Sequence, residues 1–153
     1  MSELTREQLV IWAAGFFDGE GSIWLFRARA GGRVMTLRVR VGQKTRDPLE
    51  RFVLLWGGSI WHRKANERQT EFYEWAKSSR PAYEALLEME PYLVVKRGQV
   101  QVARDFMSGV GIQGGSRGGK GNGALTPDEM ARREALQEAM HILNDGVTKQ
   151  ERA

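Results

Sequence analysis

Two carboxylates lie between glycines at the end of an apolar run, Asp18 and Glu20 in WAAGFFDGEGSI (residues 12–23). Residues two apart do not share a helical face, so one face cannot carry both. The glycines predict that the helix ends near Phe17 and that Glu20 lies just beyond its end. Carboxylate oxygens with no His or Cys beside them suit Mg²⁺, which also binds phosphate oxygens. The alternative is an ordinary core helix with two solvated capping carboxylates.

The same run is nearly flat on one side, because its small residues include Ala14, Gly15 and Gly19. Gly15 and Gly19 are four residues apart and share a face that another backbone can approach closely. If that backbone is the same helix of a second copy, two Glu20 carboxylates meet and repel unless a cation lies between them. We therefore predict a homodimer. Its predicted interface comprises Trp12, Ala14, Gly15, Phe16 and Gly19.

Length and composition place the chain in a broad class. Its 153 residues predict one domain, and the absence of cysteine excludes disulfides and thiolate zinc sites. The polar start MSELTREQ is unlike a secretory signal, and no apolar stretch is long enough to cross a bilayer. We expect a soluble intracellular protein with no membrane partner, in the cytoplasm of a prokaryote or the interior of an organelle.

Basic charge gathers in one third of the chain. Residues 22–70 hold 11 Lys/Arg and 3 Asp/Glu, whereas the net charge of the whole chain is only +4. Such clustering indicates a polyanion partner, and a merely solvated surface is the alternative. The placement of the arginines along the strands favours the polyanion.

The predicted elements alternate between helices and antiparallel hairpins. In order they are a helix (5–17), strands 22–28 and 34–43, a helix (47–56), strands 59–64 and 70–76, and helices 79–89, 96–107 and 126–144. Hairpins with helices on one face predict an α+β domain with one free, basic sheet face. The single domain (1–153) has its core at about 5–108. Residues 109–123, with 8 glycines in 15, form a connector to the last helix.

Strand alternation identifies the free face. One side of the second strand carries Met35, Leu37, Val39 and Val41, and the other carries Val34, Thr36, Arg38 and Arg40. In the first strand, alternation puts Trp24 and Phe26 on the free face and Arg27 and Arg29 opposite. A bulge before Arg27 would reverse the arginines, and the sequence does not show one.

Residues 13–21, AAGFFDGEG, resemble the signature of the LAGLIDADG homing endonucleases. The motif departs from that signature by aromatics at its fourth and fifth positions, Gly at the seventh and Glu for Asp at the eighth. VRVGQKT (39–45), the helix ending at Gly57-Gly58, and PYLVVK (91–96) also resemble family features in family order. The resemblance covers roughly residues 5–107.

The resemblance implies an αββαββα saddle of antiparallel strands that lies in the DNA major groove, here with extra C-terminal helices. Single-motif members act as homodimers on long, near-palindromic double-stranded targets. The implied metal ligands are Glu20 and the backbone of Gly19, with Mg²⁺ (or Mn²⁺) as the ion. Gln43 corresponds to a residue that organises water at the scissile phosphate, and Lys96 to a basic residue that stabilises developing charge. The implied catalytic residues of this metal-assisted hydrolysis are thus Glu20, Gln43 and Lys96.

One departure concerns a second basic residue, which relatives often place four positions after the glutamine. Asp47 occupies that position, and Arg46 is the neighbouring candidate. If Asp47 caps the helix that begins with Pro48, Arg46 can still reach the phosphate.

The free face and its flanking loops predict the DNA contacts, with arginine suited to bidentate recognition of guanine. The predicted DNA-contacting residues are Trp24, Phe26, Arg27, Arg29, Arg33, Val34, Thr36, Arg38, Arg40, Lys44, Arg46, Trp61, Arg63, Lys64, Arg68, Glu74, Arg117 and Lys120.

Two other functions compete with a DNA endonuclease. One is a non-cleaving relative that assists intron splicing or regulates transcription. The other is an NTPase, because Gly114–Lys120 fits G-x-x-x-x-G-K. Gly121 stands where a P-loop needs Ser or Thr, and no strand precedes the loop, so we expect no nucleotide cofactor.

Overall fold

Helix α1 (Arg6–Glu20) opens the structure, a computed structural model that describes residues 3–27, 34–110 and 125–145. It begins at a capping box, in which Thr5 Oγ1 accepts from the Gln8 N–H at 3.2 Å and Gln8 Oε1 accepts from the Thr5 N–H at 2.9 Å. The predicted end near Phe17 is wrong. The helix continues to Glu20, and the N–H of Gly21 then bonds the Phe17 carbonyl as the chain becomes extended.

Four antiparallel strands form one sheet in the order β1-β2-β4-β3. The strands are β1 (Gly21–Arg27), β2 (Met35–Gln43), β3 (Ile60–Arg63) and β4 (Phe72–Ser78). The two hairpins meet where β2 pairs with β4, with Val41 opposite Trp75. The predicted α+β order αββαββα is confirmed, with further helices added after it. The predicted Gly31-Gly32 turn lies outside the described residues.

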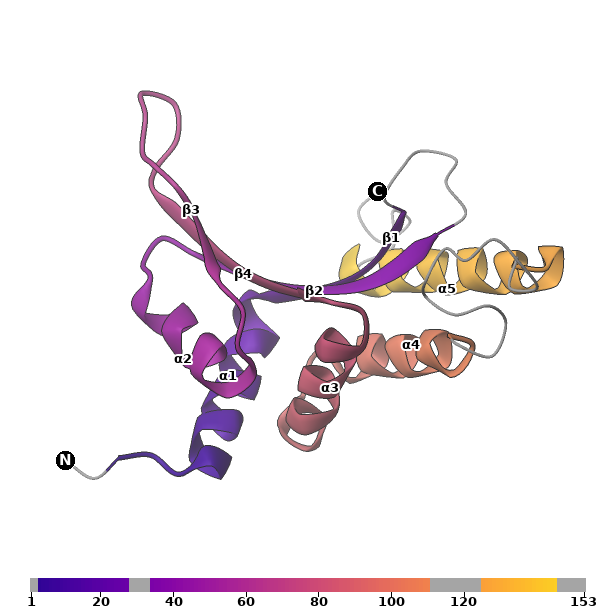
Figure 1. The fold of residues 1–153 in the computed structure, drawn as a ribbon, viewed down its shortest axis with the longest axis horizontal. Helices are drawn as coiled ribbons and strands as arrows, with labels where there is room; N and C mark the ends of the chain where they lie inside the picture. The colour runs from indigo at the N-terminus through magenta and orange to yellow at the C-terminus, as the bar shows by residue number, and fades with distance from the viewer. Residues whose placement is uncertain (1–2, 28–33, 111–124, 146–153) are drawn as a thin grey trace, which may run out of the picture.

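Helices cover one face of this sheet. Figure 1 shows α1, α2 (Asp47–Trp56), α3 (Ser79–Met89) and α4 (Arg97–Ser108) beneath the strands, and a curved opposite face across which no described helix runs. A short 3₁₀ turn (Glu90–Tyr92) links α3 to α4. Alternation sends the apolar side chains of the strands inward, and Ile23, Leu37, Val39, Val41 and Trp75 are each completely buried. Each such side chain stabilises the fold by roughly 1.5–3 kcal/mol.

Helix α3 covers the predicted residues 79–89. Serine favours the N-cap, which predicts Ser79 as the cap, but Ser78 holds that position, and Ser79 is the first helical residue, with φ of 59°. Neither the α3 cap nor Arg46, which precedes α2, makes a side-chain capping hydrogen bond. Asp47 is the first residue of α2 and Arg46 precedes it, so the alternative in which Asp47 caps this helix is wrong.

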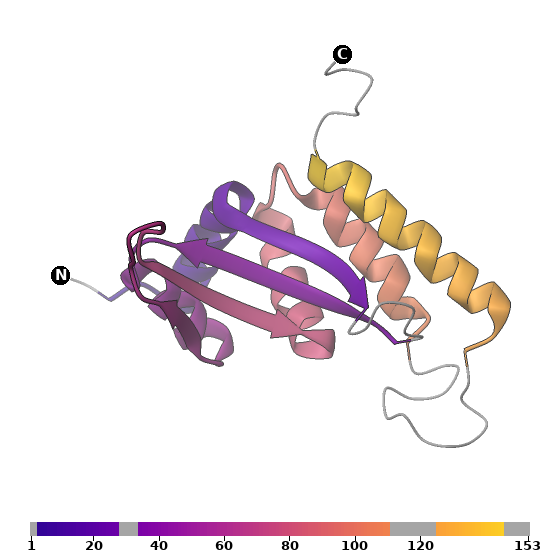
Figure 2. The ribbon, with the colours of Figure 1, turned by 90° about the horizontal axis from the view of Figure 1, so that it is seen from above.

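Helix α5 (Pro127–Asp145) lies beside α4 and against the edge strand β1 (Figure 2). The edge carbonyls of β1 accept hydrogen bonds from this helix. Gln137 Nε2 donates to Leu25 O, and Asn144 Nδ2 donates to Ile23 O, both at 2.8 Å. Met140, in the predicted apolar stripe, is completely buried. Helix α5 thus protects an edge that would otherwise be open to strand pairing. No described helix is long and apolar enough to span a membrane.

An ion pair in the first turn of α5 should make the free energy of unfolding depend on pH in the acid range. Glu129 bonds Arg132 Nε at 2.8 Å and Arg133 Nε at 2.9 Å. The Arg132 hydrogen bond, opposed by partial burial and reinforced by Arg133, lowers the pKa of Glu129 to about 2. A carboxyl whose pKa is lower in the folded state stabilises the fold above its ordinary pKa, and this contribution is lost as pH falls through the folded value.

We therefore expect Glu129 to contribute about 3 kcal/mol at neutral pH, lost between about pH 5 and 2. Urea unfolding at a series of pH values measures this contribution. In Glu129→Gln, stability at pH 7 should fall by a similar amount, and the corresponding part of the acid dependence should disappear. An unchanged acid dependence would contradict the assignment.

Candidate active site and nucleic-acid interface

Glu20 ends α1 and lies exposed where the sheet begins. The next residue, Gly21, pairs with Val41, so Glu20 comes beside the last residues of β2. Gly21 is required here, since an added Cβ would lie 2.2 Å from the Phe17 ring. The tight joint between helix and strand therefore sets the position of the Glu20 carboxylate.

Asp18 is half-buried and ties α1 to the segment before α4. Its Oδ2 accepts the Val94 N–H at 2.7 Å, and its Oδ1 accepts the N–H groups of Val95 and Lys96, both at 3.1 Å. Three backbone donors on one carboxylate make a charge-assisted anchor. This agrees with the structural role expected for Asp18, although the anchored partner is the chain's own loop.

Lys96 is brought to the same place. Its Nζ donates to the Asp18 carbonyl at 2.7 Å, which supplies a partner to the last turn of α1. Partial burial lowers the pKa of the Lys96 ammonium, and the nearby carboxylates of Asp18 and Glu20 oppose that shift. The ammonium thus lies within electrostatic reach of Glu20.

Gln43 is the last residue of β2 and is half-buried opposite Tyr73. Alternation puts it on the same side as Val41, which is the side where α1 packs. The β1–β2 register and the Lys96 hydrogen bond therefore gather Glu20, Gln43 and Lys96 at one end of the sheet.

The oxygen donors at this end fit an open cation site better than a closed metal site. Within the described segments, no three His, Cys, Asp or Glu side chains lie close enough together to hold a metal ion. One copy offers the Glu20 carboxylate and the carbonyls of the last helical turn, which carry partial negative charge. Mg²⁺ takes one or two carboxylates together with phosphate oxygens and water, so one copy supplies only part of a coordination sphere for this ion.

The candidate second basic residue is held by its own helix. Arg46 Nε bonds Glu50 Oε1 at 2.6 Å, and both side chains are about half exposed. The hydrogen bond to Glu50 raises the pKa of the Arg46 guanidinium. Asp47 is exposed at the start of α2. Arg46 remains near the end of β2 with its charge already paired.

The exposed face of α1 differs in part from the predicted interface. Ala14 is completely buried within its own chain, so it cannot line a contact with a second copy. Trp12 and Phe16 stack at 5.0 Å, are half-buried, and pack against Phe52. Gly15 and Gly19 remain open, because an added Cβ at either would meet no atom within 4 Å.

The open stripe of α1 therefore consists of Ile11, Gly15 and Gly19. Ile11 is 45% exposed, which is unusual for a large apolar residue on a well-packed helix. The sequence analysis identified Gly15 and Gly19 on this stripe but missed Ile11, which the same four-residue spacing could have found.

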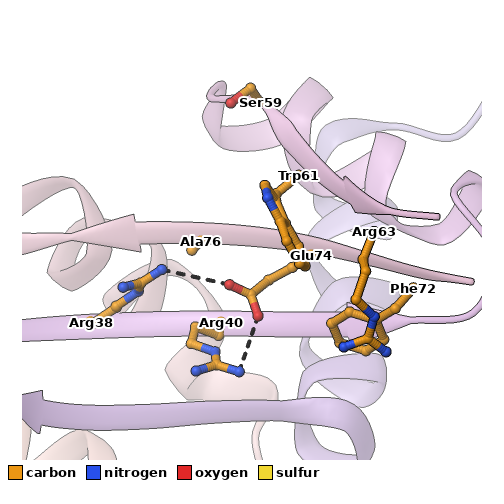
Figure 3. Close-up of a pocket in the computed structure, with 8 residues that line it drawn as sticks. All are labelled: Arg38, Arg40, Ser59, Trp61, Arg63, Phe72, Glu74 and Ala76. Atoms are coloured by element: carbon orange, nitrogen blue, oxygen red, sulfur yellow. Dashed lines mark ion pairs between the residues drawn. The ribbon is translucent and has the colours of Figure 1, made fainter. Parts of the chain in front are cut away.

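The open sheet face carries the predicted arginines. Arg38, Arg40 and Arg63 surround a hollow of about 540 Å³ together with Trp61 and Glu74 (Figure 3). The hollow also includes Ser59, Phe72 and Ala76, which were not predicted. Phe72 shares the alternation of Glu74, so the strand pattern could have identified it.

The pairing of β1 with β2 shows which face of the sheet each β1 side chain occupies. The β1–β2 ladder runs without interruption from Gly21–Val41 to Arg27–Met35, so no bulge intervenes. Trp24 and Phe26 face the open side and line a second hollow of about 310 Å³ beside Gln137 and His141 of α5. Sequence analysis could not find the α5 contribution, because it arises from tertiary packing. Arg27 bonds Glu134 of α5 at 2.6 Å.

The other predicted contacts lie around the margins of this face. Val34 is 64% exposed at the start of β2, and Thr36 follows it on the open side. Lys44, Lys64 and Arg68 are exposed in the connections after β2 and β3. Four predicted contacts lie outside the described residues, namely Arg29, Arg33, Arg117 and Lys120.

Known structures, rather than sequences, match the chain. No protein-family model and no curated protein sequence matches it. The homing endonuclease I-CvuI, solved with an I-CreI target and Mg with the DNA not cleaved, is 19% identical, with 94% of this chain and 87% of that chain covered and a TM-score of 0.69. The archaeal intron-encoded I-Vdi141I, solved with DNA, is 17% identical, with 92% and 84% covered and a TM-score of 0.64.

A third similar structure is named for the motif itself. The LAGLIDADG homing endonuclease I-GzeII, solved with a DNA target, is 12% identical over 69% of this chain and 36% of that one, with a TM-score of 0.52. At such identities the likeness establishes architecture, and it agrees with the resemblance of residues 13–21. The chain has the fold of the LAGLIDADG homing endonucleases.

Proposed function

We propose that this chain is a homodimeric, divalent-metal-dependent endonuclease that cuts both strands of a long, near-palindromic DNA target. The observation that carries the proposal is the position of Glu20. It lies exposed at the end of a helix whose outer stripe is open, within electrostatic reach of Lys96 and at the same end of the sheet as Gln43. A second copy packed on that stripe brings two such carboxylates together beside bound DNA.

Each residue of the proposed active site has a role that follows from its chemistry. Glu20 and the Gly19 carbonyl would hold the cation, and Lys96 would place positive charge where the scissile phosphate gains negative charge. Gln43 orients the attacking water, since its side chain both donates and accepts hydrogen bonds. When bound, the cation supplies a Lewis acid and lowers the pKa of water.

The sheet supplies recognition. Arg38 and Arg40 face the open side at every second position, with spacing suited to base edges in the major groove. The loop residues Lys44, Lys64 and Arg68 are exposed at the margins and suit phosphate contacts. Binding is expected to weaken steeply with salt, because neutralised phosphates release counterions.

A cleavage assay on defined DNA tests the proposal. The substrate is a DNA duplex in which the genomic sequences on the two sides of the reading frame are joined directly, with the reading frame left out. A duplex of the same composition in shuffled order is the control. We expect a double-strand cut of the joined duplex with Mg²⁺ or Mn²⁺, none of the shuffled duplex, and none after chelation. Binding without a cut under any divalent ion would replace the endonuclease with a non-cleaving DNA-binding protein.

A further inference from the structure

One acidic side chain lies within the basic open face. Glu74 of β4 is opposite Gly42 of β2, so its carboxylate reaches between two neighbouring arginines (Figure 3). Its Oε2 lies 3.0 Å from Arg40 Nη2, and its Oε1 lies 3.6 Å from Arg38 Nη2. The Glu74 side chain is only 14% exposed, whereas the arginine side chains are 38% and 45% exposed. The carboxylate is thus covered while both guanidinium groups still reach solvent.

The arginines around it are held in place by further contacts. The Arg38 guanidinium lies 5.8 Å from the centre of the Phe26 ring, and that of Arg63 lies 5.1 Å from the centre of the Phe72 ring. The Nε atoms of Arg38 and Arg63 are buried without a hydrogen-bond partner. The ring contacts and the burial of Nε restrict how these two guanidinium groups can turn, whereas a fully exposed arginine lacks such restraints.

We propose that Glu74 is a positioning residue for sequence recognition, holding Arg38 and Arg40 so that they present their remaining donors to bases and not to phosphates. The inference rests on the proposed DNA-binding function, and it is independent of cleavage. On this proposal, the Glu74 carboxylate increases the ratio between the affinity for target DNA and the affinity for other DNA.

The physical reason is competition for the guanidinium donors. A guanidinium has five N–H donors in a rigid fork, and a carboxylate that occupies one edge leaves another edge for a bidentate contact with guanine. The same carboxylate repels backbone phosphate, which penalises binding wherever no base compensates. Glu74 therefore weakens non-specific binding more than it weakens binding to the correct sequence.

The test compares two affinities in the same proteins. Fluorescence anisotropy at several salt concentrations measures binding to duplexes of random sequence and to the duplex that wild type selects from that pool. For Glu74→Ala we expect tighter binding to random duplexes, by a factor of roughly three to ten at low salt, with a salt slope steeper by about 1. The preference for the selected duplex should fall about tenfold.

Two further variants separate positioning from simple charge and from folding. Glu84→Ala removes the same charge from the exposed surface of α3, on the helical side of the sheet, and should leave the preference unchanged. Glu74→Gln keeps the size and one acceptor oxygen, so it should show the tighter random binding but retain part of the preference. It also serves if Glu74→Ala folds poorly.

The outcomes are distinct. A parallel fall of both affinities in Glu74→Gln would mean a merely structural role and would overturn the inference, as would Glu74 variants that behave like Glu84→Ala. Wild-type protein that binds neither kind of duplex would instead overturn the proposed function itself.

Discussion

Glu20→Gln should abolish DNA cleavage while DNA binding persists. The substitution keeps the side-chain size at the end of α1 but removes the negative charge and one carboxylate oxygen that would hold a cation. Loss of metal-assisted chemistry costs several kcal/mol in the barrier, so we expect the cleavage rate to fall by about a thousandfold or more. The fold should be unaffected, because Glu20 is exposed.

The expected sign of the binding change makes this prediction specific. In the proposed complex without metal, the Glu20 carboxylates repel the DNA phosphates beside them, so the variant should bind DNA equally well or more tightly in metal-free buffer. Added Mg²⁺ should then improve binding of wild type but not of the variant. Glu84→Gln, which changes an exposed glutamate on α3, is the matched control. Cleavage by Glu20→Gln at the wild-type rate would remove the metal assignment.

Local sequence predicts the fold well where the signal is periodic. The alternation of Leu37 and Val39 with Arg38 and Arg40 identified the buried and open faces of β2, because side chains of a strand alternate strictly. The predicted start of the first helix at residue 5 is likewise correct, because the capping box of Thr5 and Gln8 consists of two local hydrogen bonds.

Prediction failed where distant residues decide the outcome. Helix α1 passes its glycines because Lys96, far along the chain, bonds the Asp18 carbonyl and supplies the last turn with a partner. The ion pairs of Glu74 depend on the register between β2 and β4, which joins two separate hairpins. Neither contact is encoded by spacing within one segment, so both required the tertiary structure.

Small residue size alone does not identify the exposed face of α1. Ala14 and Gly15 are adjacent and both small, yet Ala14 is buried in the core and Gly15 is open. Successive residues on a helix differ by about 100°, so a stripe of contacts can include only one of two neighbours. The candidate interface is therefore narrower than predicted, and its centre is Gly15.

Gly15→Arg should yield a folded single copy that neither dimerises nor cuts DNA. In one copy, a side chain at position 15 meets no atom within 4 Å, so nothing opposes the substitution locally. Arginine also favours a helix over glycine, which adds up to about 1 kcal/mol to the stability of the isolated chain. A second helix cannot approach past the new side chain, so the two Glu20 carboxylates stay apart and the two half-sites are no longer bound together.

Sedimentation velocity with the target duplex, urea unfolding and the cleavage assay measure the three effects. Ala135→Arg, on the exposed side of α5, is the matched control and should dimerise and cut as wild type does. Dimers of Gly15→Arg that still cut the duplex would show that the active unit is assembled through some other surface.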